Sequence, residues 1–168
     1  QPGLPDMVFA ANSGTVIEGR VLGAKFRAPQ RAAEAEHFRR WFLARGYHQL
    51  VMPSRVNEAE GDFAWTGQVL LAGSGFRTDP AAHAEAQEVL GVPVVSLQLV
   101  DPRYYHLDTA LFVLRKGERP QIAYFPEATR AVTAGPYDVA LVEGSVTTPH
   151  DAERIQEIRA MSGTLVTI

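Results

Sequence analysis

The stretch QVLLAGSGFRTDPAAHAEAQEVLGVPVVSLQLV (68–100) decides the fold, because it predicts a helix between two strands. QVLLAG (68–73) and VPVVSLQLV (92–100) are short runs rich in apolar and β-branched residues, which is typical of buried strands. Residues 79–91 between them have a helical composition, with Asp79 as the N-cap. The stretch therefore predicts a strand–helix–strand unit.

The same order of elements is predicted on the N-terminal side. Apolar runs and turn signals indicate further strands at 7–12, 15–19, 21–26, 47–52 and 109–114, and a helix at 29–46. Two units with the order ββαβ result, related in architecture but not in sequence. The predicted fold class is therefore α/β.

The composition excludes several classes of protein. The chain has 168 residues, of which 46% are hydrophobic and 21% charged, so it can bury a core. A net charge of −3 without a basic stripe argues against nucleic-acid binding. No apolar run approaches the roughly 18 residues of a membrane span. The chain opens at Gln1 without a charged and apolar leader, as a trimmed or partial sequence would, and we expect a cytoplasmic protein.

The sequence contains no cysteine, which excludes disulfides, thiolate metal sites and thiol nucleophiles within this chain. Polar residues nevertheless gather at predicted strand ends and turns, where sites are commonly built. Carboxylates can grip a guanidinium by paired hydrogen bonds, arginines can hold a carboxylate, and a histidine can donate a proton to a leaving amine. The candidates are Asp6, Asn12, Arg31, Glu58, Glu60, Asp62, Arg77, His106 and Asp108. Each of them alone is ordinary as a turn or surface residue, so only the ordered set points to a site for a guanidino amino acid.

Together, the stretches LPDMVFAANSG, FRAPQRAAE, EGDF, LLAGSGFRTD and DPRYYHLDTAL resemble dimethylarginine dimethylaminohydrolase and its amidinotransferase relatives. The resemblance covers about residues 3–132. It implies an α/β propeller built of ββαβ modules, of which this chain would hold only a part. It also implies hydrolysis of the guanidino group of arginine or a methylated arginine through a covalent thiouronium intermediate, with neither metal nor cofactor.

The resemblance also implies roles for individual residues. His106 would be the general acid and base, oriented by Glu58 or Glu60, between which the sequence does not decide. The implied substrate-binding residues are Asp6, Asn12, Arg31, Asp62, Arg77 and Asp108. Asp6 and Asn12 would meet the guanidino group or the amine, Arg31 and Arg77 the carboxylate, and Asp108 the guanidinium.

This sequence departs from the family pattern in two ways that bear on activity. Asn12 stands where many relatives carry aspartate, which weakens the grip on a cation and leaves the identity of the substrate open. The nucleophilic cysteine of the family has no counterpart here. When one residue of a catalytic group is missing, the remaining residues no longer accelerate the reaction. We therefore expect this chain to be inactive as a hydrolase.

The segment YDVALVEGSVTTPHDAERIQEIRAMSGTLVTI (137–168) instead resembles the small subunit of nickel–iron hydrogenases and the cluster-bearing subunit of respiratory complex I. This implies a short flavodoxin-like β-α-β unit, with a strand at 137–145, a helix at 148–163 and a strand at 164–168. Cluster binding is not expected, because its cysteine ligands are absent.

The predicted organisation is thus a guanidino-hydrolase part at 1–126, a linker at 127–136 and the hydrogenase-like part at 137–168. Such a chain would be a fusion of segments from two unrelated enzymes. The predicted partner is a small guanidino amino acid, with neither nucleic acid nor membrane. Self-association is expected as well, because an open set of modules would leave strand edges unpaired. An electron-transfer fragment and a non-catalytic binding protein are the alternative functions.

Overall fold

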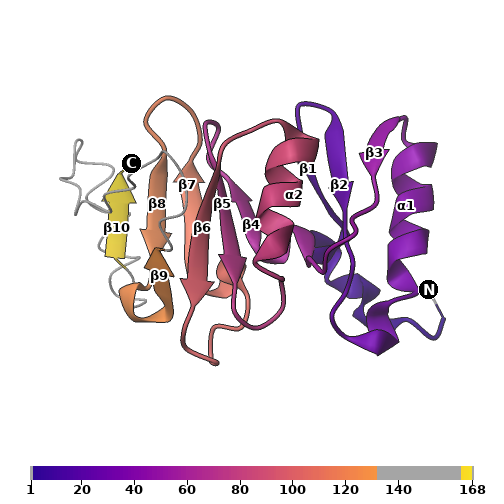
Figure 1. The fold of residues 1–168 in the computed structure, drawn as a ribbon, viewed down its shortest axis with the longest axis horizontal. Helices are drawn as coiled ribbons and strands as arrows, with labels where there is room; N and C mark the ends of the chain where they lie inside the picture. The colour runs from indigo at the N-terminus through magenta and orange to yellow at the C-terminus, as the bar shows by residue number, and fades with distance from the viewer. Residues whose placement is uncertain (1, 132–163, 168) are drawn as a thin grey trace.

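The computed structural model describes residues 2–131 and 164–167, whose short strands form small sheets (Figure 1). The first sheet contains β1 (Gly14–Ile17), β2 (Arg20–Gly23) and β3 (Gln49–Val51) in that order. β1 and β2 are antiparallel, and Glu18 and Gly19 between them have φ of 50° and 81°, as a type I′ hairpin turn requires. The chain then crosses through α1 (Glu34–Ala44) to β3, which pairs with β2 in parallel.

The second sheet repeats this arrangement. β4 (Phe63–Trp65) is antiparallel to β5 (Leu70–Ser74), and α2 (Ala81–Leu90) connects β5 to the parallel strand β6 (Val94–Leu99). α2 ends at Gly91, whose φ of 70° is left-handed, as helix ends favour. Both sheets therefore contain a ββαβ unit, as expected from the sequence, although the first strand of the second unit, β4, is not among the predicted strands.

A third sheet lies beside the second one (Figure 1). It contains β7 (Leu111–Arg115), β8 (Gln121–Tyr124) and β10 (Thr164–Thr167), with β8 in the middle and antiparallel to both neighbours. The predicted strand at 164–168 is thus present as β10. The strand and helix predicted at 137–145 and 148–163 lie outside the described residues.

One helix joins the first two sheets through a shared core. Ala82, Ala86 and Leu90 occupy one face of α2 and are buried against Leu22 of β2 and Leu70 of β5. The two alanines let the helix approach the strands closely, and fully burying a leucine contributes roughly 1.5–3 kcal/mol. This packing fixes the two ββαβ units relative to each other.

The site lies where three short 3₁₀ turns meet. They are η2 (Ala10–Ser13), η4 (Ala59–Gly61) and η5 (Leu107–Thr109), each at an end of a strand. Since each turn precedes or follows a strand anchored in a sheet, segments far apart in the sequence meet at one point.

The structure corrects several predicted elements. Residues 7–12 do not form a strand, because this segment folds into the 3₁₀ turns η1 (Pro5–Val8) and η2. Residues 29–31 form the separate 3₁₀ turn η3 (Pro29–Arg31), so the first helix begins later than predicted, at Glu34.

The predicted linker is also wrong over 127–131, because this segment is part of the fold. η6 (Pro126–Ala128) leads into β9 (Thr129–Ala131), which pairs antiparallel with β6. The strands β4 and β8 were not predicted either, since runs of three and four residues carry too little periodicity. No helix among the described residues has the length and apolarity needed to cross a membrane.

Candidate active site

His106 lies buried between two carboxylates at the start of η5. Its Nε2 atom is 3.3 Å from Oε2 of Glu58, and its Nδ1 atom is 3.2 Å from Oδ1 of Asp62. His106 is 7% exposed, and Glu58 and Asp62 are each 0% exposed. Both carboxylates are therefore close enough to pair with a protonated ring.

This arrangement makes His106 a strong base. Burial alone would lower the pKa of His106, but hydrogen bonding and charge from Asp62 and Glu58 outweigh it and raise the pKa to about 9. The ring is therefore protonated at neutral pH. A protonated imidazole at a pocket wall is a proton donor, as a general acid must be.

Glu58, and not Glu60, is the carboxylate that contacts His106. Oε2 of Glu58 also lies 3.4 Å from Nη1 of Arg77, and Oε1 accepts a hydrogen bond from the backbone N–H of Arg27 at 3.3 Å. Burial alone would raise the pKa of Glu58, but these partners lower it overall. Glu60 is exposed, and it is Glu58 that lies within 3.3 Å of the histidine.

Asp62 lies behind His106 and is not among the residues that line the pocket. Its Oδ2 atom accepts a hydrogen bond from the Thr78 hydroxyl at 2.6 Å. Its Oδ1 atom accepts one from the backbone N–H of Leu107 at 3.1 Å. Both carboxylate oxygens are therefore held by protein donors while one of them faces His106.

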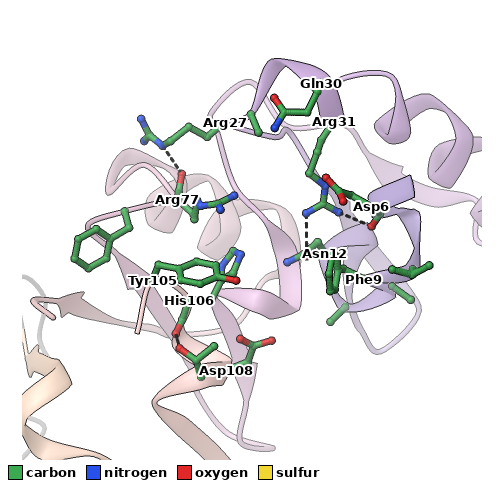
Figure 2. Close-up of a pocket in the computed structure, with 16 residues that line it drawn as sticks. Asp6, Phe9, Asn12, Arg27, Gln30, Arg31, Arg77, Tyr105, His106 and Asp108 are labelled. Carbon is green, nitrogen blue, oxygen red and sulfur yellow. Dashed lines mark hydrogen bonds between the residues drawn. The ribbon is translucent and has the colours of Figure 1, made fainter. Parts of the chain in front are cut away.

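A pocket of about 710 Å³ opens in front of His106 (Figure 2). Acidic, basic and aromatic side chains from separate segments share its wall. Of the residues expected from the sequence, those that line it are Asp6, Asn12, Arg31, Arg77, His106 and Asp108. The pocket thus offers acids for a cation and arginines for an anion.

Arg31 lines the pocket, but its hydrogen bonds are largely used within the protein. Nη2 of Arg31 lies 2.8 Å from Oε2 of Glu34 and donates to the backbone carbonyl of Asp6 at 3.2 Å. Nη1 donates to Oδ1 of Asn12 at 3.1 Å. A carboxylate in the pocket would therefore have to compete with Glu34 for this guanidinium.

Asn12 bridges two parts of the site. Its Nδ2 atom donates to the backbone carbonyl of Glu58 at 3.0 Å, while its Oδ1 atom accepts from Arg31. Gly61 lies directly beneath this amide. A Cβ atom at Gly61 would collide with Nδ2 of Asn12 and approach Nδ1 of His106 to 3.2 Å. Only glycine fits at this position without displacing the site.

Arg77 reaches into the pocket beside the histidine. Its guanidinium lies 5.0 Å from the centre of the Tyr105 ring, which in turn is 5.0 Å from the His106 ring (Figure 2). Nε of Arg27 donates to the backbone carbonyl of Arg77 at 2.8 Å, which brings a second guanidinium to the same wall. This wall is the basic side of the pocket.

Asp108 supplies negative charge at another part of the wall. Asp108 is exposed, but partial desolvation at the pocket wall raises its pKa; the charge of His106 opposes this effect and that of Asp62 adds to it. A cationic group bound in the pocket would favour the ionised form of Asp108.

Several pocket residues were not singled out in the sequence. Phe9, Arg27, Gln30 and Tyr105 line the pocket. Arg27 lies in the stretch FRAPQR beside Arg31, and Tyr105 precedes His106 in sequence, so proximity to a motif was the available signal. No pattern in the sequence distinguishes Phe9 from a buried apolar residue.

A carboxylate-flanked histidine on paired ββαβ units defines a mixed α/β protein with a candidate acid/base site. No family model matches the chain. The N(G),N(G)-dimethylarginine dimethylaminohydrolase of Mycobacterium tuberculosis is 52% identical over 126 residues, which are 75% of this chain and 40% of the relative. The bifunctional arginine dihydrolase/ornithine cyclodeaminase AgrE of Nostoc sp. is 37% identical over 131 residues, which are 76% of this chain and 18% of the relative.

The comparison with solved structures finds the same kind of protein. The N-terminal domain of the cyanobacterial arginine dihydrolase ArgZ, in a cysteine-to-serine variant bound to substrate, superposes with a TM-score of 0.72 and 34% identity. That match covers 77% of this chain and 48% of the ArgZ domain. Over about three quarters of its length the chain is therefore similar to a dimethylarginine dimethylaminohydrolase and to arginine dihydrolases, and it spans less than half the length of these relatives.

The family resemblance read from the sequence is thus confirmed. The resemblance of 135–168 to hydrogenase and complex I subunits is not supported by these matches, which are to a dimethylarginine dimethylaminohydrolase and to arginine dihydrolases.

Proposed function

We propose that this chain carries the substrate-binding and acid/base part of a hydrolase that acts on the guanidino group of arginine or a methylated arginine. The observation that carries the proposal is His106, which lies between Glu58 and Asp62 and faces a pocket with separate acidic and basic groups. The similarity to a dimethylarginine dimethylaminohydrolase and to arginine dihydrolases supports the same substrate class.

The charged groups of the pocket suit the two ends of such a substrate. Asp6 and Asp108 would attract the guanidinium, because ionised carboxylates accept its N–H groups in pairs. Arg77 would hold the α-carboxylate, and Arg31 could join it only by sharing its bond to Glu34. The substrate would then lie across the face of His106.

In this proposal His106 acts as the general acid. When a nucleophile attacks the guanidinium carbon, a C–N bond breaks and the leaving amine takes the proton from the imidazolium. The neutral imidazole can then accept a proton from the water that releases the product. Glu58 and Asp62 would stabilise the protonated ring at the start of each cycle.

No residue of this chain can supply a thiolate, because the sequence has no cysteine. We therefore propose that the chain by itself binds its substrate but does not hydrolyse it. The ArgZ domain in which a cysteine is replaced by serine was solved with substrate bound, which supports binding without the thiol in that relative. By itself, the chain would thus behave as a binding protein.

Calorimetry with arginine, monomethylarginine and agmatine tests the binding proposal. Agmatine keeps the guanidino group but lacks the carboxylate, so arginine should bind at least tenfold more tightly through Arg77, which corresponds to about 1.4 kcal/mol. The absence of saturable heat with every guanidino compound would contradict the proposal. A parallel assay for released ammonia, methylamine or citrulline should detect no turnover. Hydrolysis by the parent chain that disappears in His106→Ala would contradict the proposal that the chain alone is inactive.

We also propose that the ββαβ units belong to an α/β propeller of which this chain forms a part, because both units share one topology. Val8, Phe9 and Phe112 are large apolar side chains that are 78%, 57% and 58% exposed. Such side chains favour association, so we propose that the chain self-associates. Light scattering at several concentrations should show a rising mass, and a constant monomer mass would contradict this.

A further inference from the structure

Thr78 is a buried residue that contacts both carboxylate-bearing segments of the site. It lies between Arg77 and the start of α2, is 1% exposed and does not line the pocket. Its hydroxyl donates to Oδ2 of Asp62 at 2.6 Å and accepts the backbone N–H of Glu58 at 3.1 Å. One side chain therefore touches both residues that flank the histidine.

We propose that Thr78 is a positioning residue whose hydroxyl holds Glu58 and Asp62 against the two ring nitrogens of His106. Its importance for catalysis rests on the proposed function. The positioning itself concerns only the protein, so it can be tested without any substrate.

A hydroxyl is suited to this place because it donates one hydrogen bond and accepts others at the same time. The donated bond is short, as expected for a hydroxyl bonded to an ionised carboxylate. Since Oδ1 of Asp62 receives Leu107 N–H and faces His106, the bond from Thr78 to Oδ2 fixes the rotation of the carboxylate. Valine has the same shape but neither donates nor accepts.

The accepted bond holds a strained turn. Ala59, which follows Glu58, has a positive φ of 50° and is 0% exposed. Such a conformation persists only where surrounding bonds enforce it. Three bonds meet here, because Thr78 accepts Glu58 N–H, Asn57 Oδ1 accepts Ala59 N–H, and Asn12 donates to the Glu58 carbonyl. Thr78 thereby directs the side chain of Glu58 toward the histidine.

The support of Thr78 is itself anchored. The backbone N–H of Asp79 donates to the carbonyl of Val56 at 2.9 Å, and the Asp79 carboxylate accepts from Ala81 N–H at 2.9 Å at the start of α2. The position of the hydroxyl is therefore set by a helix that packs on both ββαβ units.

The decisive measurement is an NMR titration of the His106 ring in Thr78→Val and Thr78→Ser. In Thr78→Val a methyl group replaces the hydroxyl next to Asp62, the carboxylate must move away, and the pKa of His106 should fall by about one unit or more. Thr78→Ser keeps the hydroxyl and should shift it by less than about 0.3 units. Thr66→Val is the matched control, because Thr66 is also buried but its hydroxyl bonds only to Gln68 and Val69 in its own loop. It should leave the titration unchanged.

If the pKa of His106 in Thr78→Val equals that in the parent protein, the proposal is overturned. The same holds if the pKa falls as far in Thr78→Ser as in Thr78→Val. Should Thr78→Val fail to fold, Thr78→Ala removes the hydroxyl without adding bulk and should show the same fall. Failure to bind arginine would count against the proposed function alone, since the titration contains no ligand.

Discussion

The Nε2 atom of His106 lies 3.3 Å from Oε2 of Glu58, and this contact joins two turns that are distant in the sequence. The same carboxylate oxygen faces Arg77, so one buried anion serves both the proton donor and a cation of the pocket wall. A change in Glu58 should therefore alter the acid/base group and the binding wall together.

Glu58→Gln should lower the pKa of His106 and reduce the free energy of unfolding by roughly 3 kcal/mol, as expected when one partner of a buried ion pair is removed. The reason is that His106 and Arg77 both lose a buried anion. Glu60→Gln is the matched control, since Glu60 is exposed and two positions away. NMR titration and urea unfolding of both variants provide the comparison, and equal effects in the two would contradict the assignment of Glu58.

The stability of the protein should fall as the pH rises from 6.5 toward 9. The folded pKa of His106 is about 9, above its ordinary value of 6.5, so the folded state binds more protons in this window. Its contribution is complete below pH 6.5 and disappears as the pH passes through about 9, at up to about 1.4 kcal/mol per pH unit. Urea midpoints across this range measure the slope. In His106→Gln the slope should be much smaller, and an equally steep slope there would assign it to other groups.

Gly61→Ala should disrupt the site, because a Cβ atom there meets the amide of Asn12 and the ring of His106. We expect a loss of about 1–3 kcal/mol from overpacking, together with loss of arginine binding. Gly46→Ala is a control of similar cost, about 1 kcal/mol, because Gly46 has a φ of 86° in open space at the end of α1. It should retain binding. Calorimetry of both variants would refute the proposed crowding if Gly61→Ala bound arginine as tightly as the parent.

Arg77→Gln should abolish the preference for arginine over agmatine, because its guanidinium is the proposed contact for the carboxylate. Arg103→Gln is the control, since Arg103 also lies over a tyrosine ring and pairs with an acid, Asp101, but outside the pocket. Competition calorimetry with the two ligands compares the variants. A preference that survives in Arg77→Gln would assign the carboxylate to Arg31 or Arg27.

Much of the fold could be predicted because its signals are local. The ββαβ order follows from apolar runs, turn residues and a glycine after α2, each readable over a few residues. The segment 7–12 is predicted as a strand but forms 3₁₀ turns, because its apolar composition suits a strand as well as a packed turn. The pairing of β9 with β6 could not be predicted, since it depends on contacts between distant segments.

The sequence by itself determined the α/β class, the family resemblance and most of the polar residues that meet at the site. Only the tertiary structure shows that Glu58, rather than Glu60, contacts His106 and that Asp62 lies behind the ring. It also shows that the Thr78 hydroxyl bonds to Asp62. The physical reason is that side-chain direction at η4 depends on the positive φ of Ala59, which the hydrogen bonds of the surrounding turns impose. Residue spacing along a chain does not encode that constraint, because the bonding partners come from other segments.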